Sequence, residues 1–329
     1  MLVPVVKKIT ENRKCFIERV FPVGGVWGVK EGDFVEPFNS LGDCRFSQNK
    51  LSLPDGFKPV DLKTPSKFYY VDTLLGKAKN EKIFAPYDGT LKEIEGGGFV
   101  FEENERKYVL LSGVWGNVKS FYENMSALIE TQTKDILLAS STKFHASGEL
   151  VVFPNPSDVL KTSYLENFVK GIKGKIVYIG DYVSVDVVKR AYELEASALL
   201  VGSAHNEVFD FAKEHNFPIG IFCGFGRLKT SEEIYKFLSS VSYRYVFFEG
   251  ENNLLRIPVR VEDLNPEKEV SENAVFKNIE QGMTVQILQD PHFGQTGVVD
   301  TVGESSIFVR FSVDNIIAEV RYPNFFIVE

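Results

Sequence analysis

Side chains able to do chemistry follow three consecutive apolar segments in the second half of the chain. They are Asp181 after the first segment, His205 after the second, and Cys223 and Arg227 after the third. A thiol beside an imidazole could serve as nucleophile and base, and Gly224 and Gly226 could leave backbone N–H groups free to meet an anion. The pattern therefore indicates a small-molecule or phosphate site, as a hypothesis.

The same residue types also serve to turn a chain at the end of a strand. No Gly-x-Gly-x-x-Gly motif follows the first segment, and no Walker lysine pattern is present. A cysteine nucleophile with a histidine base also needs a third, orienting group, which the sequence does not identify. Catalysis, noncatalytic ligand binding and plain turn formation are therefore all open from these residues alone.

The three segments belong to a region, residues 171–260, in which strand and helix patterns alternate. Strands are predicted at 175–179, 198–201, 218–222 and 243–248, and helices at 184–196, 206–215 and 230–238. Thr230 and Glu233 have the spacing of a capping box at the start of the last helix. Strands joined by helices make a parallel sheet, whose carboxyl edge would bring the chemical side chains together.

Residues 1–120 show the short alternating apolar runs of a β domain. Val23–Pro37 and Ile83–Ile94 resemble the two halves of a biotinyl/lipoyl-type barrel-sandwich hybrid. In carrier proteins of that type a modified lysine lies near the place of Lys77 and Lys79. The Met-Lys-Met or Asp-Lys-Ala signature is absent here, so neither biotin nor lipoate is expected, and no other cofactor is predicted.

Residues 121–170 have a weaker pattern and are predicted to be a connecting region. A short helix is expected from Ser120 to Ile129, with short strands at 135–139 and 149–153. Pro154–Ser157 has the composition of a turn.

The segment Gly282–Val299 resembles the KOW hairpin of NusG-type transcription factors and several ribosomal proteins. Alternating apolar residues predict two strands, and Gly294 and Gly297 lie where a tight loop can need positive φ. The resemblance implies a small SH3-like barrel over residues 271–329. Its strands are expected at 284–288, 297–302, 307–313, 318–321 and 325–328.

Charge bears on what such a barrel could bind. The chain carries a net charge of −8, and from Ser271 to Glu329 eight acidic side chains outnumber three basic ones. Nonspecific phosphate binding needs clustered cations, because its affinity comes from counterion release. KOW domains usually bind RNA or protein through the hairpin loop, but this loop lacks Lys and Arg. Protein docking is thus favoured over RNA binding, with His292, Phe293 and Gly294 as candidate contacts, although Phe293 could instead be a buried hairpin residue.

Composition excludes several other classes. A hydrophobic content of 44% and a charged content of 25% are ordinary for a globular protein. The three cysteines (Cys15, Cys44 and Cys223) are far apart, and neither they nor the four histidines have metal-ligand spacing, so no metal site is expected. No apolar run is long enough to cross a membrane, and the opening apolar stretch is too short for a signal peptide, which predicts a cytoplasmic location.

The whole layout is similar to a group of uncharacterised bacterial multidomain proteins that join a lipoyl-like hybrid, an α/β module and a KOW-like barrel. The matching segments are Gly113–Gly116, Gly224–Gly226, Ile257–Pro258 and Val320–Val328. The resemblance implies a multidomain α+β fold with a β-rich barrel-sandwich hybrid (1–120), a connecting region (121–170), a parallel-sheet α/β domain (171–260) and a C-terminal SH3-like β-barrel (271–329).

The leading functional hypothesis is a noncatalytic cytoplasmic adaptor that docks on a large assembly, with the transcription or translation machinery as the first candidate. One alternative is a small-molecule-binding or enzymatic α/β module with its site at the strand edge. A second alternative is direct RNA binding through the KOW-like barrel.

Overall fold

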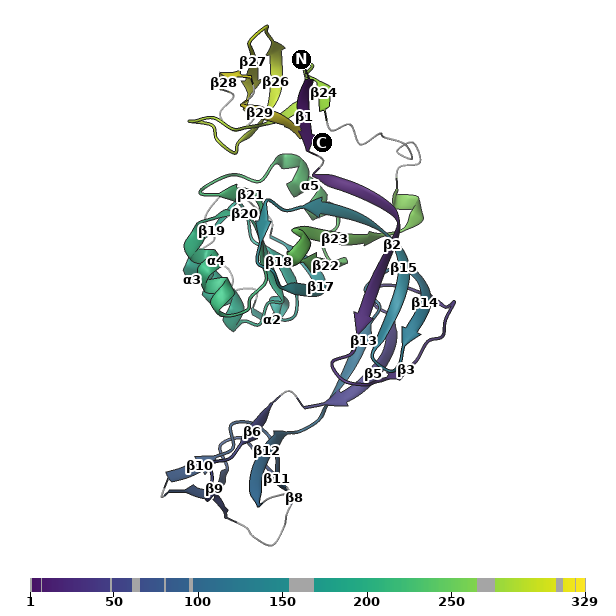
Figure 1. Ribbon diagram of the computed structural model, residues 1–329, viewed down its shortest axis with the longest axis vertical. Helices are drawn as coiled ribbons and strands as arrows, with labels where there is room; N and C mark the ends of the chain where they lie inside the picture. The colour runs from purple at the N-terminus through teal and green to yellow at the C-terminus, as the bar shows by residue number, and fades with distance from the viewer. Residues whose placement is uncertain are drawn as a thin grey trace.

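The computed structural model of this chain is an extended arrangement of several β-sheets (Figure 1). It describes residues 2–6, 8–47, 49–60, 66–79, 81–94, 97–153, 169–264, 276–311, 316–322 and 324–328. Strands make up 53% and helices 12% of the described residues, so sheet packing supplies most of the core. None of the helices in these ranges is long and apolar enough to cross a membrane.

A twelve-stranded sheet forms the centre of the molecule. In spatial order its main path is β16 (Ser140–Ser141), β21 (Ile219–Phe225), β20 (Ala198–Ala204), β18 (Ile176–Tyr178), β17 (His145–Val152), β22 (Tyr245–Glu249), β23 (Leu254–Val259), β15 (Ser126–Leu137), β14 (Gly116–Tyr122) and β4 (Phe34–Val35). Two further strands of the sheet lie outside this path. Strand β19 (Tyr182–Val183) pairs with β20, and β2 (Ile9–Val20) pairs with β15.

Helices cover both faces of the part of this sheet that contains β17 to β21. They are α2 (Val169–Ile172), α3 (Val185–Glu193), α4 (Asn206–Glu214) and α5 (Glu232–Ser240), with 3-10 turns at Gly250–Asn252 and Val261–Asp263. Residues of α3 and α4 such as Val188 and Phe209 pack on one face, with Val201. Ile234 and Leu238 of α5 pack on the other face, with Tyr178.

The predicted alternation of strands and helices over 175–248 is confirmed element by element. Strands β17, β18, β20 and β21 pair in parallel. The prediction that 243–248 joins this parallel set is wrong, because β22 pairs antiparallel with β17. The chain leaving α5 pairs with the first half of β17, running from Glu149 back to His145, instead of running beside the half that pairs with β18. The N-cap of α5 is Ser231, whose side chain accepts a hydrogen bond from the Ile234 N–H, rather than Thr230.

The helix predicted from Ser120 to Ile129 is wrong, because β14 and β15 pair there as an antiparallel hairpin. Strand β15 also pairs with β2 and β23, and β17 with β18 and β22. Two strands from the predicted connecting region, β15 and β17, therefore lie in the interior of the largest sheet. The buried positions of β15 alternate along the strand but include the polar residues Thr131, Thr133 and Asp135, so the sequence lacks the apolar period of a half-buried strand. The turn predicted at Pro154–Ser157 lies outside the described residues.

Below the central sheet, a small sheet of β13 (Arg106–Leu111), β5 (Ser40–Phe46) and β3 (Val26–Trp27) packs against β2, β14 and β15. A distal module, residues 49–105, lies at the far end of the molecule (Figure 1). One of its sheets is β6 (Lys50–Ser52), β12 (Gly98–Glu103), β11 (Gly89–Ile94) and β8 (Ser66–Tyr69), and the other is β10 (Glu81–Phe84), β9 (Leu74–Ala78) and β7 (Lys58–Pro59).

The segments expected to be two halves of one hybrid lie in different parts of the molecule. Val23–Pro37 contains β3 and β4, which pair with β5 and β14. Ile83–Ile94 contains part of β10 and all of β11, which pair only within the distal module. Each segment thus forms turns and strands as its pattern predicts, but with partners that the local pattern did not identify.

A seven-stranded terminal sheet joins the two ends of the chain. Its order is β24 (Phe276–Asn278), β1 (Leu2–Val6), β29 (Phe325–Val328), β25 (Thr284–Ile287), β26 (Thr296–Val302), β27 (Ser306–Arg310) and β28 (Ile317–Arg321). The five strands predicted here are confirmed, whereas β1 and β24 were not predicted as members. Strand β1 pairs parallel with β29 and antiparallel with β24, so Val3 joins the core of this module.

Candidate functional site

A closed network of hydrogen bonds occupies the carboxyl ends of β18 and β20. Asp181 is buried, and its Oδ1 accepts a hydrogen bond from the Thr230 N–H at 2.9 Å. The Thr230 hydroxyl in turn accepts from the Tyr178 hydroxyl at 2.7 Å. Burial raises the pKa of Asp181, and the hydrogen bonds from Thr230 oppose this rise. The carboxylate is therefore engaged in holding the loop that leads into α5.

Ser203 extends the same network. Its backbone N–H donates to the Asp181 carbonyl at 2.7 Å, and its hydroxyl accepts from the Leu228 N–H at 2.8 Å. The hydroxyl oxygen also lies 2.9 Å from the Leu228 carbonyl oxygen, to which it can donate. The loop 223–230 is thus tied to the ends of two neighbouring strands.

Cys223 lies on the α5 side of this edge, among residues of the core around Tyr178. Its Sγ donates to the Lys229 carbonyl oxygen at 3.2 Å. Burial raises the pKa of Cys223 to about 12, and the opposing effect of the Lys8 ammonium is smaller. Because only a thiolate is a good nucleophile, this environment disfavours the thiol chemistry that the sequence allowed.

His205 and Arg227 lie on an exposed part of the edge and share Tyr182 as a partner. The His205 ring meets the Tyr182 ring edge-on at a centroid distance of 5.4 Å. The Arg227 guanidinium lies 5.0 Å from the same ring centroid, as a cation–π contact. Within the described part of the chain, no hydrogen bond joins His205 to Cys223. The structure therefore separates the predicted base from the predicted nucleophile.

The glycine loop is formed as expected but is engaged internally. Gly224 and Gly226 have φ of 149° and 106°. The Gly226 N–H donates to the Ala204 carbonyl at 3.0 Å, so it is already used. This loop closes the end of β21 against β20.

The predicted hairpin loop of the terminal sheet lies against that same strand edge. Gly294 has φ of 78° and is buried, and a Cβ added to it would lie 2.7 Å from the Leu228 Cδ1. The Gly294 carbonyl accepts from Gln286 Nε2 at 3.0 Å. Gly297, expected to need positive φ, instead lies within β26, where a Cβ would meet Val309 at 2.5 Å. One of the three predicted partner contacts is therefore an internal contact between modules.

The other two loop residues differ in exposure. His292 stacks on Phe311 at a centroid distance of 4.5 Å, and its Nδ1 lies 3.3 Å from Gln295 Oε1. Phe293 is 55% exposed, which excludes the alternative of a buried hairpin residue. Phe293 is thus the loop side chain that remains available to another molecule.

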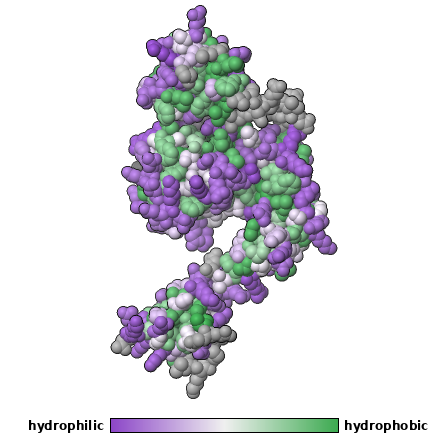
Figure 2. Space-filling model, viewed as in Figure 1, coloured by the Kyte–Doolittle hydropathy of each residue, from purple (hydrophilic) through white to green (hydrophobic). Residues whose placement is uncertain are grey.

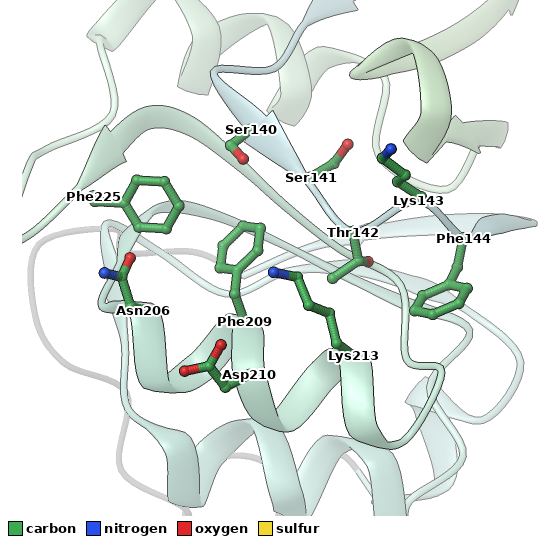
Figure 3. A pocket seen from close by; sticks show the side chains of 10 residues that line it. All are labelled: Ser140, Ser141, Thr142, Lys143, Phe144, Asn206, Phe209, Asp210, Lys213 and Phe225. Carbon is green, nitrogen blue, oxygen red and sulfur yellow. The ribbon is translucent and has the colours of Figure 1, made fainter.

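A pocket of about 520 Å³ lies beside this edge, between β16, α4 and the end of β21 (Figure 3). Its apolar wall includes Phe209 and Phe225, whose ring centroids are 5.1 Å apart. The pocket is lined by Ser140, Ser141, Thr142, Lys143, Phe144, Asn206, Phe209, Asp210, Lys213 and Phe225. The hydroxyl groups of Ser141 and Thr142 are already bonded to backbone carbonyls, so the Ser140 hydroxyl, the two lysines, Asn206 and Asp210 are the polar groups able to meet a ligand.

Sequence reasoning missed the residues that connect the predicted ones. Local sequence signals mark Thr230 only as part of a predicted helix cap and give no role to Ser203, Leu228 or Lys8. Their roles depend on contacts across more than 20 positions of chain, for which no local signal exists. No group of three His, Cys, Asp or Glu side chains in the described ranges is arranged to hold a metal ion.

Comparisons with known proteins supply no family assignment. No protein-family model matches the sequence, and no match was found among curated proteins. The candidate functions therefore rest on the geometry described above.

Proposed function

We propose that this protein is a noncatalytic adaptor that docks on a large assembly, with the transcription or translation machinery as the first candidate. The terminal sheet is proposed to act as a KOW-like, SH3-type module in this role. The resemblance of Gly282–Val299 to the KOW hairpin supports that assignment, as do the five strands that follow the expected pattern.

The observation that carries the proposal is an apolar outer face on β26, β27 and β28. Val298 and Ile317 are both in register with Arg310, so the three side chains share one face. Phe308 lies two residues before Arg310 on the same face and is 41% exposed. We call Val298, Phe308 and Ile317 the apolar face. Figure 2 shows apolar and polar surface side by side on this module at the top of the molecule.

The composition of the apolar face suits a protein partner. An aromatic and two branched aliphatic side chains can anchor a partner by burial, whereas phosphate contacts require cations. Arg310 is paired with Asp300, which leaves little free positive charge on this face. The exposed Phe293 belongs to the hairpin loop of the same module and adds a further anchor.

The strand-edge chemistry gives no comparable support for catalysis. Asp181 is hydrogen-bonded to Thr230, the Cys223 thiol has a raised pKa, and His205 contacts Tyr182 instead. These groups therefore serve to hold the loop 223–230, which contacts the terminal sheet through Leu228.

The test is affinity capture of the tagged full-length protein from its native cells, with and without nuclease. We expect a stoichiometric set of polymerase or ribosomal subunits that survives nuclease. A Phe308→Ser/Ile317→Ser variant should lose this set, whereas Val109→Ser, which alters an exposed valine on β13, should keep it. Recovery of the protein alone, or equal capture by the double variant, would contradict the proposal.

A second candidate, small-molecule binding by the α/β region, is favoured by the pocket beside Phe225. Lys143 and Lys213 could hold an anionic group there, with Phe209 and Phe225 against an apolar part. Thermal shift of the full chain in the presence of nucleotides and metabolites tests this candidate. We expect a shift that Lys213→Ala abolishes. No shift with any compound would reject it.

Direct RNA binding through the terminal sheet is the remaining candidate, and its acidic composition weighs against it. Phosphate binding weakens steeply as salt rises, whereas docking through apolar anchors changes little. The salt dependence of any captured complex therefore separates these two possibilities.

A further inference from the structure

Three lysines stand directly opposite one another across one sheet of the distal module. Lys77 on β9 is in register with Lys58 on β7 and with Lys82 on β10. Paired residues on adjacent strands point to the same face, so the three ammonium groups form a single row, here called the lysine row. All three side chains are exposed. Lys58 and Lys77, together with Lys79, also line a depression of about 420 Å³.

This arrangement is unfavourable for the folded protein by itself. Like charges directly opposite on neighbouring strands repel each other and destabilise the sheet. Among the described residues, none of the three has an ion-pair partner. In the other sheet of the same module, lysines on neighbouring strands are neutralised by a carboxylate between them. Lys50 and Lys92 both form ion pairs with Glu102, at 2.9 and 2.6 Å. The row is thus a local concentration of positive charge on a chain whose net charge is −8.

Two exposed apolar side chains flank the lysine row. Phe84 lies two residues after Lys82 on β10, and Ile83 between them packs against the core of the module. Phe84 is 50% exposed. Val60 lies two residues after Lys58 and is 62% exposed. The pairing of β9 with β10 shifts register between Ile83 and Phe84, and β7 ends at Pro59, so Phe84 and Val60 flank the lysine row where regular strand pairing ends. Each lies two positions beyond a lysine, about 6.7 Å along the chain where it is extended.

We propose that this face of the distal module binds single-stranded nucleic acid. The lysine row would contact consecutive phosphates, and the Phe84 ring would stack on an unpaired base. A positive track beside an exposed aromatic ring is the combination used by proteins that bind single strands without sequence preference. An acidic peptide would use the lysines but has no need of the aromatic ring. The site is separate from the terminal sheet and does not depend on the function proposed for it.

The experiment measures binding of a fluorescein-labelled oligouridylate to the full-length protein by anisotropy over a range of salt concentrations. Each phosphate contact in a single strand contributes about 0.7 to the slope of log affinity against log salt. Lys77→Gln should lower the slope by about 0.7, and the Lys58→Gln/Lys77→Gln/Lys82→Gln variant by about 2. Phe84→Ala should weaken binding roughly tenfold with little change in slope.

Lys92→Gln is the matched control, because it removes a lysine of the same module that is paired with Glu102. It should bind as the unaltered protein does. Absence of binding at low salt, or equal binding by the triple variant and the control, would overturn the proposal. Equal affinity for a duplex would contradict the single-strand assignment and point to duplex binding. Displacement by polyglutamate, with no effect of Phe84→Ala, would point to an acidic protein as the partner instead.

Discussion

At the scale of single residues, the chemical groups at the strand edge are governed by burial and by local hydrogen bonds. Asp181 and Cys223 are both moved away from the ionised form, because low-dielectric surroundings disfavour charge. Functional sites often show such shifts, but structural loops produce them too. Here the partners of both groups are backbone atoms of the same loop, Thr230 N–H and the Lys229 carbonyl, which favours a structural role.

Alkylation tests directly whether the Cys223 thiol is ionised in the folded protein. With its pKa at about 12, its thiolate population at pH 8 is on the order of a thousandfold below that of an ordinary cysteine. We expect iodoacetamide to modify Cys223 in the native protein correspondingly slowly, and at the ordinary rate after denaturation, as followed by peptide mass spectrometry. Rapid native modification would restore the nucleophile hypothesis.

The Asp181→Asn variant tests how much the buried carboxylate charge lowers the stability of the folded protein. The pKa of Asp181 is raised in the folded protein, so the folded state binds the proton more tightly than the unfolded state. Stability is therefore lost as pH rises from the ordinary aspartate pKa of about 3.9 through the raised value. Asparagine keeps an oxygen for the Thr230 N–H and has no charge to bury.

Thermal unfolding across the pH range is the measurement. The Asn variant should melt above the unaltered protein at pH 7, and the two should converge near pH 4. A lower melting temperature at pH 7 would mean that the charge itself stabilises the loop.

At the scale of elements, β9 is a strand in which one charged side chain lowers the stability of the sheet that the strand belongs to. Its inner residues, Leu75 and Ala78, are buried in the core of the distal module, while Lys77 faces two further lysines. Natural proteins retain such costs where function requires them.

Lys77→Gln should therefore stabilise the distal module. Removing the central charge relieves repulsion with both neighbours, each opposite pair being worth roughly 0.2–1 kcal/mol. Lys92→Gln should instead destabilise slightly or not at all, because it removes an exposed ion pair. Hydrogen-exchange protection of β9 and β10 reports the difference, and a loss of protection in Lys77→Gln would contradict the argument.

At the scale of the whole molecule, contacts distant in sequence hold the modules in place. Strand β1 completes the terminal sheet from the opposite end of the chain, and Leu228 of the α/β region lies against Gly294. The terminal sheet is consequently built from both ends of the chain.

Val3→Ala tests the contribution of β1. Val3 is buried in the core of the terminal sheet, and truncating it should cost about 2 kcal/mol. Leu2→Ala is the matched control, because Leu2 is largely exposed on the same strand and should change stability by less than about 0.5 kcal/mol. Hydrogen exchange of Phe325–Val328 locates the effect. Equal protection in both variants would show that β1 is dispensable.

The sequence determined where strands and helices occur wherever a local period was strong. The alternation over 175–248 and the five strands of 284–328 follow from apolar spacing and glycine turns, which depend on neighbours within a few residues. The same local nature explains the error at Ser120–Ile129, because this window contains a hairpin turn and only a few residues of each of β14 and β15, too few to show the period of a strand.

Only the tertiary structure decided which elements meet. It placed β1 beside β29, separated His205 from Cys223, put Gly294 against Leu228, and aligned Lys58, Lys77 and Lys82 in one row. Strand register and long-range packing are set by the burial of the whole core, and a shift of one residue would turn every side chain to the other face. Such pairings carry no signature in a single local window, which is why the lysine row became visible only in the folded molecule.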